Sequence, residues 1–405
     1  MLGSVSRLRL SLVCAPGTPV ADMLAHSAPI PLIIDHFFNN HEITAEDEEG
    51  ITLALQHRDR VRRIRLRGRA PILQKIISFL DGEFSILESL LIVPRWRPCD
   101  ENGKFPESFR TPHLRHLFLT SADISIGSPL LTTTTSLVTL SLDSIPQSAY
   151  FNPDVLLQRV SLMPQLEILG IYFCPHIETQ LLHTPIMTRV TLPNLRWLGF
   201  KGSSSYLEAI LPLVTLPLFE KLQVYFFNQL AYSIPHLQQF MSTAENLWPN
   251  TIMLAFHSQC VEVMAYPHEG ARMYTLSLSL GTRKIDRQVT SVIQVLQTLR
   301  AFSTVEHLAL KYDGRSKSSR IVEPGRAQWR ELLRLFINVK TLFVEGRLVE
   351  QLSRALQPGT GESPIELLPE LQELSCPVVT YLVDAFTSFI DAREKSGRPV
   401  AMIHP

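Results

Sequence analysis

The chain has 405 residues, and its 38 lysine and arginine residues balance its 38 aspartate and glutamate residues, so the formal net charge is zero. A neutral chain lacks the overall positive charge that favours nucleic acid or an anionic membrane surface as a partner. Apolar residues make up 45% of the chain, and no uninterrupted apolar run approaches the roughly 18 residues of a membrane span. These values predict a core-forming protein without a membrane segment, and they argue against nucleic acid as its partner.

Residues 1–60 are predicted to be an N-terminal capping segment of helix, strand and helix that carries a first irregular repeat. Apolar runs at 7–13 and 30–35 predict short strands. Residues 44–59 predict a helix, because Thr44 stands at the N-cap position and acidic residues, including the one three positions later, fill the first turn.

From residue 61 to residue 382 the chain repeats one phrase, in which two residues and then one residue separate three apolar positions. A phrase that recurs about every 20 to 35 residues is typical of a solenoid. The phrase begins at Val61, Leu87, Leu114, Leu137, Leu166, Leu195, Phe219, Met273, Val305, Val339 and Leu371.

The step from Phe219 to Met273 is long enough for two repeats. The segment "TIMLAF" at 251–256 supplies a degenerate copy, which we expect to lie between its neighbours in chain order. The last positions of every copy alternate, which predicts a strand whose apolar residues point into the core. One such strand cannot bury its apolar face alone, so stacked copies are expected to pair into a parallel sheet.

The segments between the strands have the apolar spacing of helices. Several start on proline or on a polar N-cap residue, as helices commonly do. The predicted helices span 71–82, 152–164, 205–213, 235–247, 286–302 and 327–338, and a capping helix with a tail is expected at 383–405. Strands that alternate with helices predict an α/β leucine-rich-repeat solenoid, a ribonuclease-inhibitor-like horseshoe with parallel strands on the concave face and helices on the convex face.

The cysteines and the N-terminus bear on the cellular compartment. The five cysteines are scattered and never form a CxxC pair, so neither a disulfide framework nor a structural zinc site is expected. Arg7 and Arg9 interrupt the apolar run near the N-terminus, which argues against a signal peptide. Reduced thiols predict a cytoplasmic or nuclear protein.

The order and spacing of several stretches resemble the leucine-rich-repeat region of the F-box-like proteins of mushroom-forming (basidiomycete) fungi. They are "MLAHSAPIPLIIDH", "RDRVRRIRLRG", "FRTPHLRHLFL", "GSPLLTTTTSLVTLSL", "LLQRVSLMPQLEILGI", "LPNLRWLGF", "SPIELLPELQEL" and "FIDAREKSGRPV", which together span roughly 23–400. The resemblance implies a substrate receptor, in which an F-box binds a Skp-type adaptor of a cullin ubiquitin ligase and the repeats hold the target. No F-box pattern precedes the repeats here, so the adaptor is an expected partner only if an F-box exists upstream.

The residues that flank the last two apolar positions of each copy are expected on the concave face. In the middle of the array four of them are aromatic, namely Phe118, Tyr172, Trp197 and Tyr225. Aromatic side chains carry much of the energy of protein interfaces, where a large truncation costs about 2 kcal/mol or more. We predict that they bind a protein partner. The alternatives are scattered surface aromatics, or a face covered by helices or loops.

A basic stripe is expected on one of the first strands of the array. Arg63, Arg65 and Arg67 alternate along it and would form one row on the concave face. Guanidinium groups bind carboxylate and phosphate bidentately, so the row could receive an acidic or phosphorylated segment, or RNA phosphates. The alternatives are charge pairing with the acidic helix start at 45–49, or solvation.

Catalytic patterns are weak. Cys174 with His176, and His257 with Cys260, are close in sequence, but nothing supplies the third group that orients a nucleophilic pair. No phosphate-binding glycine motif, nucleophile elbow or zinc-protease motif occurs. We therefore predict a protein that is not an enzyme, with no catalytic residue, metal site or cofactor.

Three functions remain open. The first is a protein-binding receptor of a ubiquitin ligase, and the second is a stand-alone leucine-rich-repeat scaffold or inhibitor. The third, disfavoured, is an enzyme whose site lies on the loops of the solenoid.

Overall fold

The computed structural model describes most of the chain. The described residues are 11–27, 30–37, 42–95, 103–175, 188–227, 229, 232–244, 247–282, 284–299, 301–313, 325–358, 366–377 and 385–403. The chain forms two compact units. Unit 1 comprises residues 1–199 and 213–218, and unit 2 comprises residues 200–212 and 219–405.

Unit 1 is built on a parallel sheet whose strands pair in chain order. They are β1 (Leu12–Cys14), β2 (Leu32–His36), β3 (Val61–Gly68), β4 (Ser89–Pro94), β6 (His116–Thr120), β8 (Thr139–Ile145) and β9 (Ile168–Phe173). Two small parallel pairs accompany this sheet, β5 (Gly103–Lys104) with β7 (Ala122–Asp123) and β10 (Val190–Thr191) with β12 (Val214–Thr215). The strand β11 (Trp197–Gly202) begins in unit 1 and ends in unit 2.

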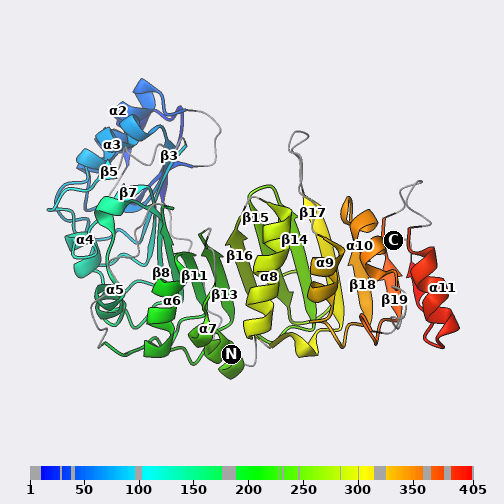
Figure 1. Ribbon diagram of the computed structural model, residues 1–405. Helices are drawn as coiled ribbons and strands as arrows, with labels where there is room; N and C mark the ends of the chain where they lie inside the picture. Colours follow the sequence, from blue (N-terminus) through cyan, green and yellow to red (C-terminus); the bar gives the residue numbers. More distant parts are fainter. Residues whose placement is uncertain are drawn as a thin grey trace, which may run out of the picture. The chain divides into compact units, whose positions relative to one another are not determined.

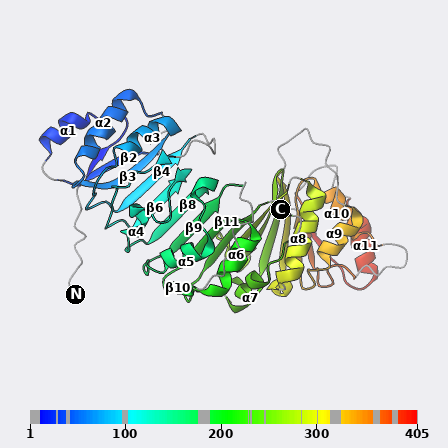
Figure 2. The same ribbon diagram turned by 60° about the vertical axis from the view of Figure 1, so that its left-hand side comes forward.

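The helices of unit 1 connect these strands. They are α1 (Val20–His26), α2 (Ala45–Gln56), α3 (Ala70–Ser78), α4 (Pro129–Thr132), the 3₁₀ turn η1 (Gln147–Ala149) and α5 (Pro153–Val160). Figure 2 shows α1, α2 and α3 packed side by side along the strands β2 to β4. The predicted start of α2 is confirmed, because Thr44 and Asp47 form a capping box.

The sheet of unit 2 does not follow chain order. Its strands are β13 (Lys221–Phe226), β14 (Thr251–His257), β15 (Cys260–Tyr266), β16 (Leu276–Gly281), β17 (His307–Asp313), β18 (Thr341–Val344), β19 (Glu373–Ser375) and β20 (Ala401–Ile403). They pair in the order β13, β16, β15, β14, β17, β18, β19, β20. β15 is antiparallel to both of its neighbours, and the other pairs are parallel.

The helices of unit 2 are α6 (Ser204–Ile210), α7 (Pro235–Thr243), α8 (Ile285–Leu299), α9 (Arg326–Leu333), α10 (Leu348–Leu356) and α11 (Thr387–Lys395). The 3₁₀ turn η5 (Ala301–Thr304) follows α8, and a further turn η3 (Leu211–Leu213) ends at the unit boundary. Figure 1 shows α8 and α9 in front of β15, β14 and β17. After α11 the chain returns to the sheet as β20.

The fold class is confirmed: the protein is an α/β leucine-rich-repeat solenoid with helices on one face of its parallel strands. The repeated phrase supplies the core, since its second and third apolar positions are buried in copy after copy, as at Leu90, Ile92, Leu117 and Leu119. Burial of such side chains stabilises by about 1.5–3 kcal/mol each.

Three expectations about the middle of the array are wrong. The prediction of parallel strands throughout fails at β15. The segment 251–256, expected between its neighbours in chain order, forms β14, which pairs with β15 and β17 while β16 lies beside β13. Met273, expected to begin a core phrase, is 65% exposed, because it lies in the loop that joins β15 to β16.

One buried side chain joins the segment from β14 to β16, whose strand order is inverted, to helix α8. Gln288 of α8 is 1% exposed, and its Nε2 donates hydrogen bonds to the carbonyl oxygens of His257 and Thr282, each at 2.8 Å. His257 is the last residue of β14, and Thr282 directly follows β16. The amide therefore ties α8 to the carboxyl ends of these two strands.

Candidate partner-binding faces of the sheet

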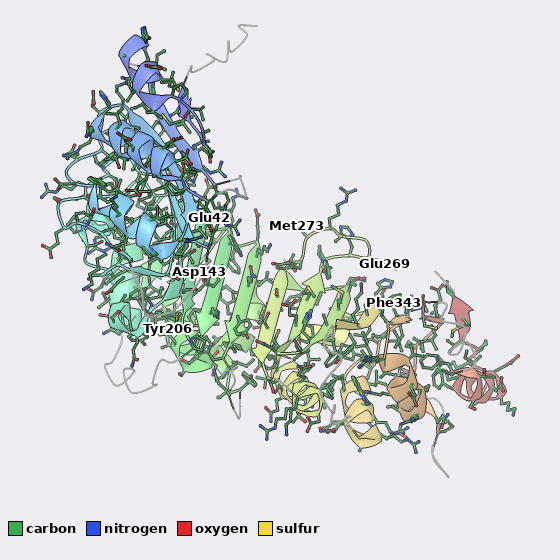
Figure 3. All side chains as sticks on the ribbon, turned by 90° about the horizontal axis from the view of Figure 1, so that it is seen from above. Glu42, Asp143, Tyr206, Glu269, Met273 and Phe343 are labelled. Atoms are coloured by element: carbon green, nitrogen blue, oxygen red, sulfur yellow. The ribbon has the colours of Figure 1, made fainter. Side chains whose placement is uncertain are left out.

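Each sheet has an open face, which we define as the face turned away from the helices. Because side chains alternate along a strand, the open face carries the residues between the core positions. In unit 2, Phe343 and Glu269 lie on the side of the sheet opposite α8 and α9 (Figure 3). No helix of the described part of the chain is long and apolar enough to cross a membrane.

The three predicted arginines lie together on the open face of unit 1. Arg63, Arg65 and Arg67 alternate along β3 with the buried Ile64 and Leu66. Their registered neighbours on β4 are Ser89, Leu91 and Val93, which carry no charge. The open-face row that the sequence predicts is therefore present on this strand.

Two of the three arginines have no acidic partner among the described residues. Arg65 binds Asp35 of β2 through Nη1 and Oδ2 at 3.2 Å, and its guanidinium lies 5.2 Å from the ring centroid of Phe37. Arg67 lies 5.9 Å from the same ring, and both Arg63 and Arg67 are exposed.

The predicted alternative, pairing of the stripe with the acidic start of α2, is not what the described residues show. Asp47 caps α2, and Glu48 binds Lys75 of α3. Two neighbouring arginines pair elsewhere: Arg62 of β3 with Glu88 at 2.8 Å, and Arg69, which follows β3, with Glu42 at 2.5 Å. The positive charges of Arg63 and Arg67 therefore remain available to an acidic group.

The positive potential of these arginines extends to His116 on β6. Burial, followed by the charges of Arg115 and Arg63, holds the pKa of His116 below its ordinary value, although Glu167 and Glu88 act in the opposite direction. His116 Nδ1 lies 3.2 Å from the hydroxyl of Thr139 on β8. A neutral imidazole at this place leaves the positive charge of the face to the arginines.

Two of the predicted aromatics lie near one another on the open face of unit 1. Phe118 of β6 is registered with Ser141 of β8, which is registered with Gly170 of β9, so small residues lie on this side of the ring, while Leu91 of β4 lies on the other side. Tyr172, two residues further along β9, lies against Gly170. The glycine and the serine leave room for both rings.

The ring of Tyr172 also covers Gly199. A Cβ built on Gly199 would lie 2.8 Å from the ring Cζ and closer still to the hydroxyl oxygen, and one built on Gly170 would lie 2.8 Å from Cε2. Real Cβ atoms are not found so close to other heavy atoms. The tyrosine therefore lies flat against the sheet at two positions that only glycine can occupy without displacing it.

Trp197 is half-buried at the start of β11 in unit 1. Its backbone N–H donates to the carbonyl of Glu167 at 3.1 Å, which anchors the strand. Phe118, Tyr172 and Trp197 therefore belong to unit 1, whereas Tyr225 belongs to β13 of unit 2. The four predicted aromatics divide between the two units.

Tyr225 lies among charged side chains on the open face of unit 2. The ammonium of Lys201 is 5.2 Å from its ring centroid. Burial and the nearby Cys260 and Glu262 raise the pKa of the Tyr225 hydroxyl, so it stays protonated at neutral pH. It can therefore donate a hydrogen bond to a partner.

The sequence patterns missed an apolar row on the open face of unit 2. Met264 of β15 is registered with Met253 of β14. Met253 is in turn registered with Ala309 of β17, and Ala309 with Phe343 of β18. All four are half-buried. Repeat spacing could not align them, because the inversion of β14 to β16 decides which strands are neighbours.

The candidate Cys–His pairs gain no support. Burial and the charge of Glu262 raise the pKa of Cys260 to about 11, which opposes thiolate formation. His176, the partner proposed for Cys174, lies outside the described residues. Among the residues that the structure describes, no group of three or more metal-ligating side chains is gathered.

Comparisons with known proteins find similarity among solved structures. No family model matches the chain, and no curated protein matches it. Among solved structures, it is similar to the leucine-rich repeat-containing protein LegL7 from Legionella pneumophila, with 12% identity and a TM-score of 0.35, over 97% of this chain and 99% of that one. The fold assignment rests on the strand–helix repeats themselves.

Proposed function

We propose that the chain is a protein-binding scaffold that holds its partner on the open face of unit 1. The observation that carries this proposal is the combination of Phe118, Tyr172 and Trp197 with the unneutralised Arg63 and Arg67 on one sheet. Aromatic and arginine side chains are enriched among the residues that dominate interface energies. A parallel sheet with helices on one side also presents its other side to solution without a cover.

A finer proposal is that the scaffold serves as the substrate-recognition part of an F-box type ubiquitin-ligase receptor. It is supported by the resemblance of the repeats to the basidiomycete F-box-like proteins. The adaptor would bind through an F-box, and the target would bind through the repeats. The alternative is a stand-alone leucine-rich-repeat scaffold or inhibitor without a ligase.

Affinity purification with mass spectrometry, from the cells that express the chain, separates these alternatives. The chain is compared with a form extended by any in-frame upstream sequence. Recovery of a Skp-type adaptor with the extended form supports the receptor proposal. Recovery of a reproducible partner without any adaptor rejects the receptor and retains the scaffold.

The location of the binding face is tested with matched variants. We expect Phe118→Ala and Trp197→Ala each to weaken binding of the recovered partner by about tenfold or more, because each removes a large half-buried aromatic side chain. Phe79→Ala is the control, since Phe79 is 41% exposed and ends α3 outside the sheet. Equal loss in the control, or none in the sheet variants, would place the partner elsewhere.

A further inference from the structure

The open face of unit 2 carries a second feature, a carboxylate among aromatic and methionine side chains. Glu262 lies on β15, two residues from Met264. Met264 pairs directly with Met253 across the strand boundary. We call Glu262, Met253, Met264, Tyr266 and Phe343 the Glu262 surface.

Glu262 has no permanently charged partner in the described part of the chain. The ring of His257 has Nε2 3.8 Å from Oε2, and Ser279 donates a hydrogen bond to Oε1 at 3.5 Å. The carboxylate side chain is 34% exposed. A half-buried carboxylate in this state gains most from a cation that a partner brings.

The lysines that border the surface are engaged elsewhere. Lys311 binds Glu345 with Nζ 3.9 Å from Oε2 and lies 5.6 Å from the ring centroid of Phe343. Lys221 lies 4.0 Å from the ring centroid of Tyr274. The ammonium group of Lys311 is therefore paired with Glu345 and not with Glu262.

The negative charge of Glu262 affects the pKa values of the tyrosines around it. Burial raises the pKa of Tyr225, Tyr266 and Tyr274, and Glu262 raises each of them further. The carboxylate therefore sets a negative potential beside protonated tyrosines. Such a place suits an arginine, whose guanidinium pairs with carboxylates and stacks on aromatic rings.

The methionines beside Glu262 indicate which side chain of a bound peptide would lie next to its cation. Glu262 and Met264 are next to each other on the same face of one strand, which separates them by about 6.8 Å. Residues i and i+2 of an extended peptide have the same separation. Methionine side chains are flexible and polarisable, and they accept aliphatic side chains of varied shape.

We propose that the Glu262 surface binds an extended protein segment that places an arginine against Glu262 and an aliphatic side chain, two residues away, against Met253 and Met264. The proposal rests on the proposed function only in giving the chain a protein partner. It concerns unit 2 and its own set of residues, so the two can fail separately.

The test is selection of a random linear-peptide display library on the purified full chain, followed by affinity measurements on the enriched peptides. We expect enrichment of arginine-x-aliphatic sequences. Glu262→Gln should weaken their binding by about fivefold or more, because it removes the charge and keeps the shape. Glu331→Gln is the matched control, since Glu331 is exposed on α9, on the other side of the sheet, and should change nothing.

Several results would overturn the inference. These are enrichment of acidic peptides whose binding depends on Arg63 and Arg67, enrichment of the expected peptides with no effect of Glu262→Gln, and no enrichment at all. The first would support the proposed function of unit 1 while rejecting the Glu262 surface. Thermal unfolding of each variant confirms that a loss of binding is not a loss of fold.

Discussion

Gly199→Ala is a direct test of how Tyr172 shapes the open face of unit 1. The new methyl group would lie 2.8 Å from Cζ of Tyr172 and closer to its hydroxyl oxygen, so the ring must leave its position over the sheet. A ring forced about 30° from its rotamer costs about 0.5–1.5 kcal/mol. The backbone at Gly199 requires no positive φ, so steric conflict with the ring is the main cost.

A double-mutant cycle with Tyr172→Ala measures this conflict. We expect Gly199→Ala to lower the free energy of unfolding by about 1 kcal/mol in the native background and by much less when Tyr172 is alanine, because the clash has been removed. Chemical denaturation followed by circular dichroism gives the four stabilities. Equal costs in both backgrounds would show that Tyr172 does not lie over Gly199.

Three further predictions concern buried polar side chains. His36 is 6% exposed, and burial lowers its pKa despite the opposing charges of Asp47 and Asp35. The stability that the neutral ring contributes is therefore full above the unfolded-state pKa near 6.5 and is lost as the pH falls through the lower folded-state pKa. His36→Leu should remove this loss of stability in denaturation measured as a function of pH. A native protein whose stability stays constant from pH 7 to below that window would contradict this. Arg393 is fully buried and donates hydrogen bonds to the carbonyls of Leu368, Pro369, Leu371 and Arg398. Arg393→Met should therefore cost about 3–5 kcal/mol in local stability and expose α11 to hydrogen exchange. Arg398→Met, which removes an exposed ion pair with Glu370, should cost less than about 1 kcal/mol. Gln288→Leu leaves two strand-end carbonyls unpaired and should speed exchange at the ends of β14 and β16; unchanged exchange there would contradict the role given to this amide.

Local features of the fold were predictable from the sequence because they depend on neighbours along the chain. The capping box of Thr44 and Asp47 needs only a three-residue spacing, and the alternation of Arg63, Arg65 and Arg67 places them on one face of any strand. Their partners were not predictable. Asp35 comes from the preceding strand, 30 residues away from Arg65, and no spacing rule selects it.

The inversion of β14 to β16 was hidden from repeat spacing for a related reason. Leu276 and Leu278 are buried in β16 as a regular copy would be, so the phrase at Met273 looked ordinary. The order of these strands follows from the antiparallel pairing of β15 with β14 and with β16, which leaves no periodic signal. Met253 lies beside Met264 only because of that pairing.

The most direct test of the central claim, that the open face of unit 1 holds a protein partner, is the dissociation constant of the purified partner for the chain and for Arg63→Ala/Arg67→Ala/Trp197→Ala. The three substitutions remove two unneutralised charges and one aromatic side chain from a single face. We predict that binding weakens by about a hundredfold or more while the thermal midpoint shows that the fold is retained. Binding with the native constant by a folded variant would contradict the account.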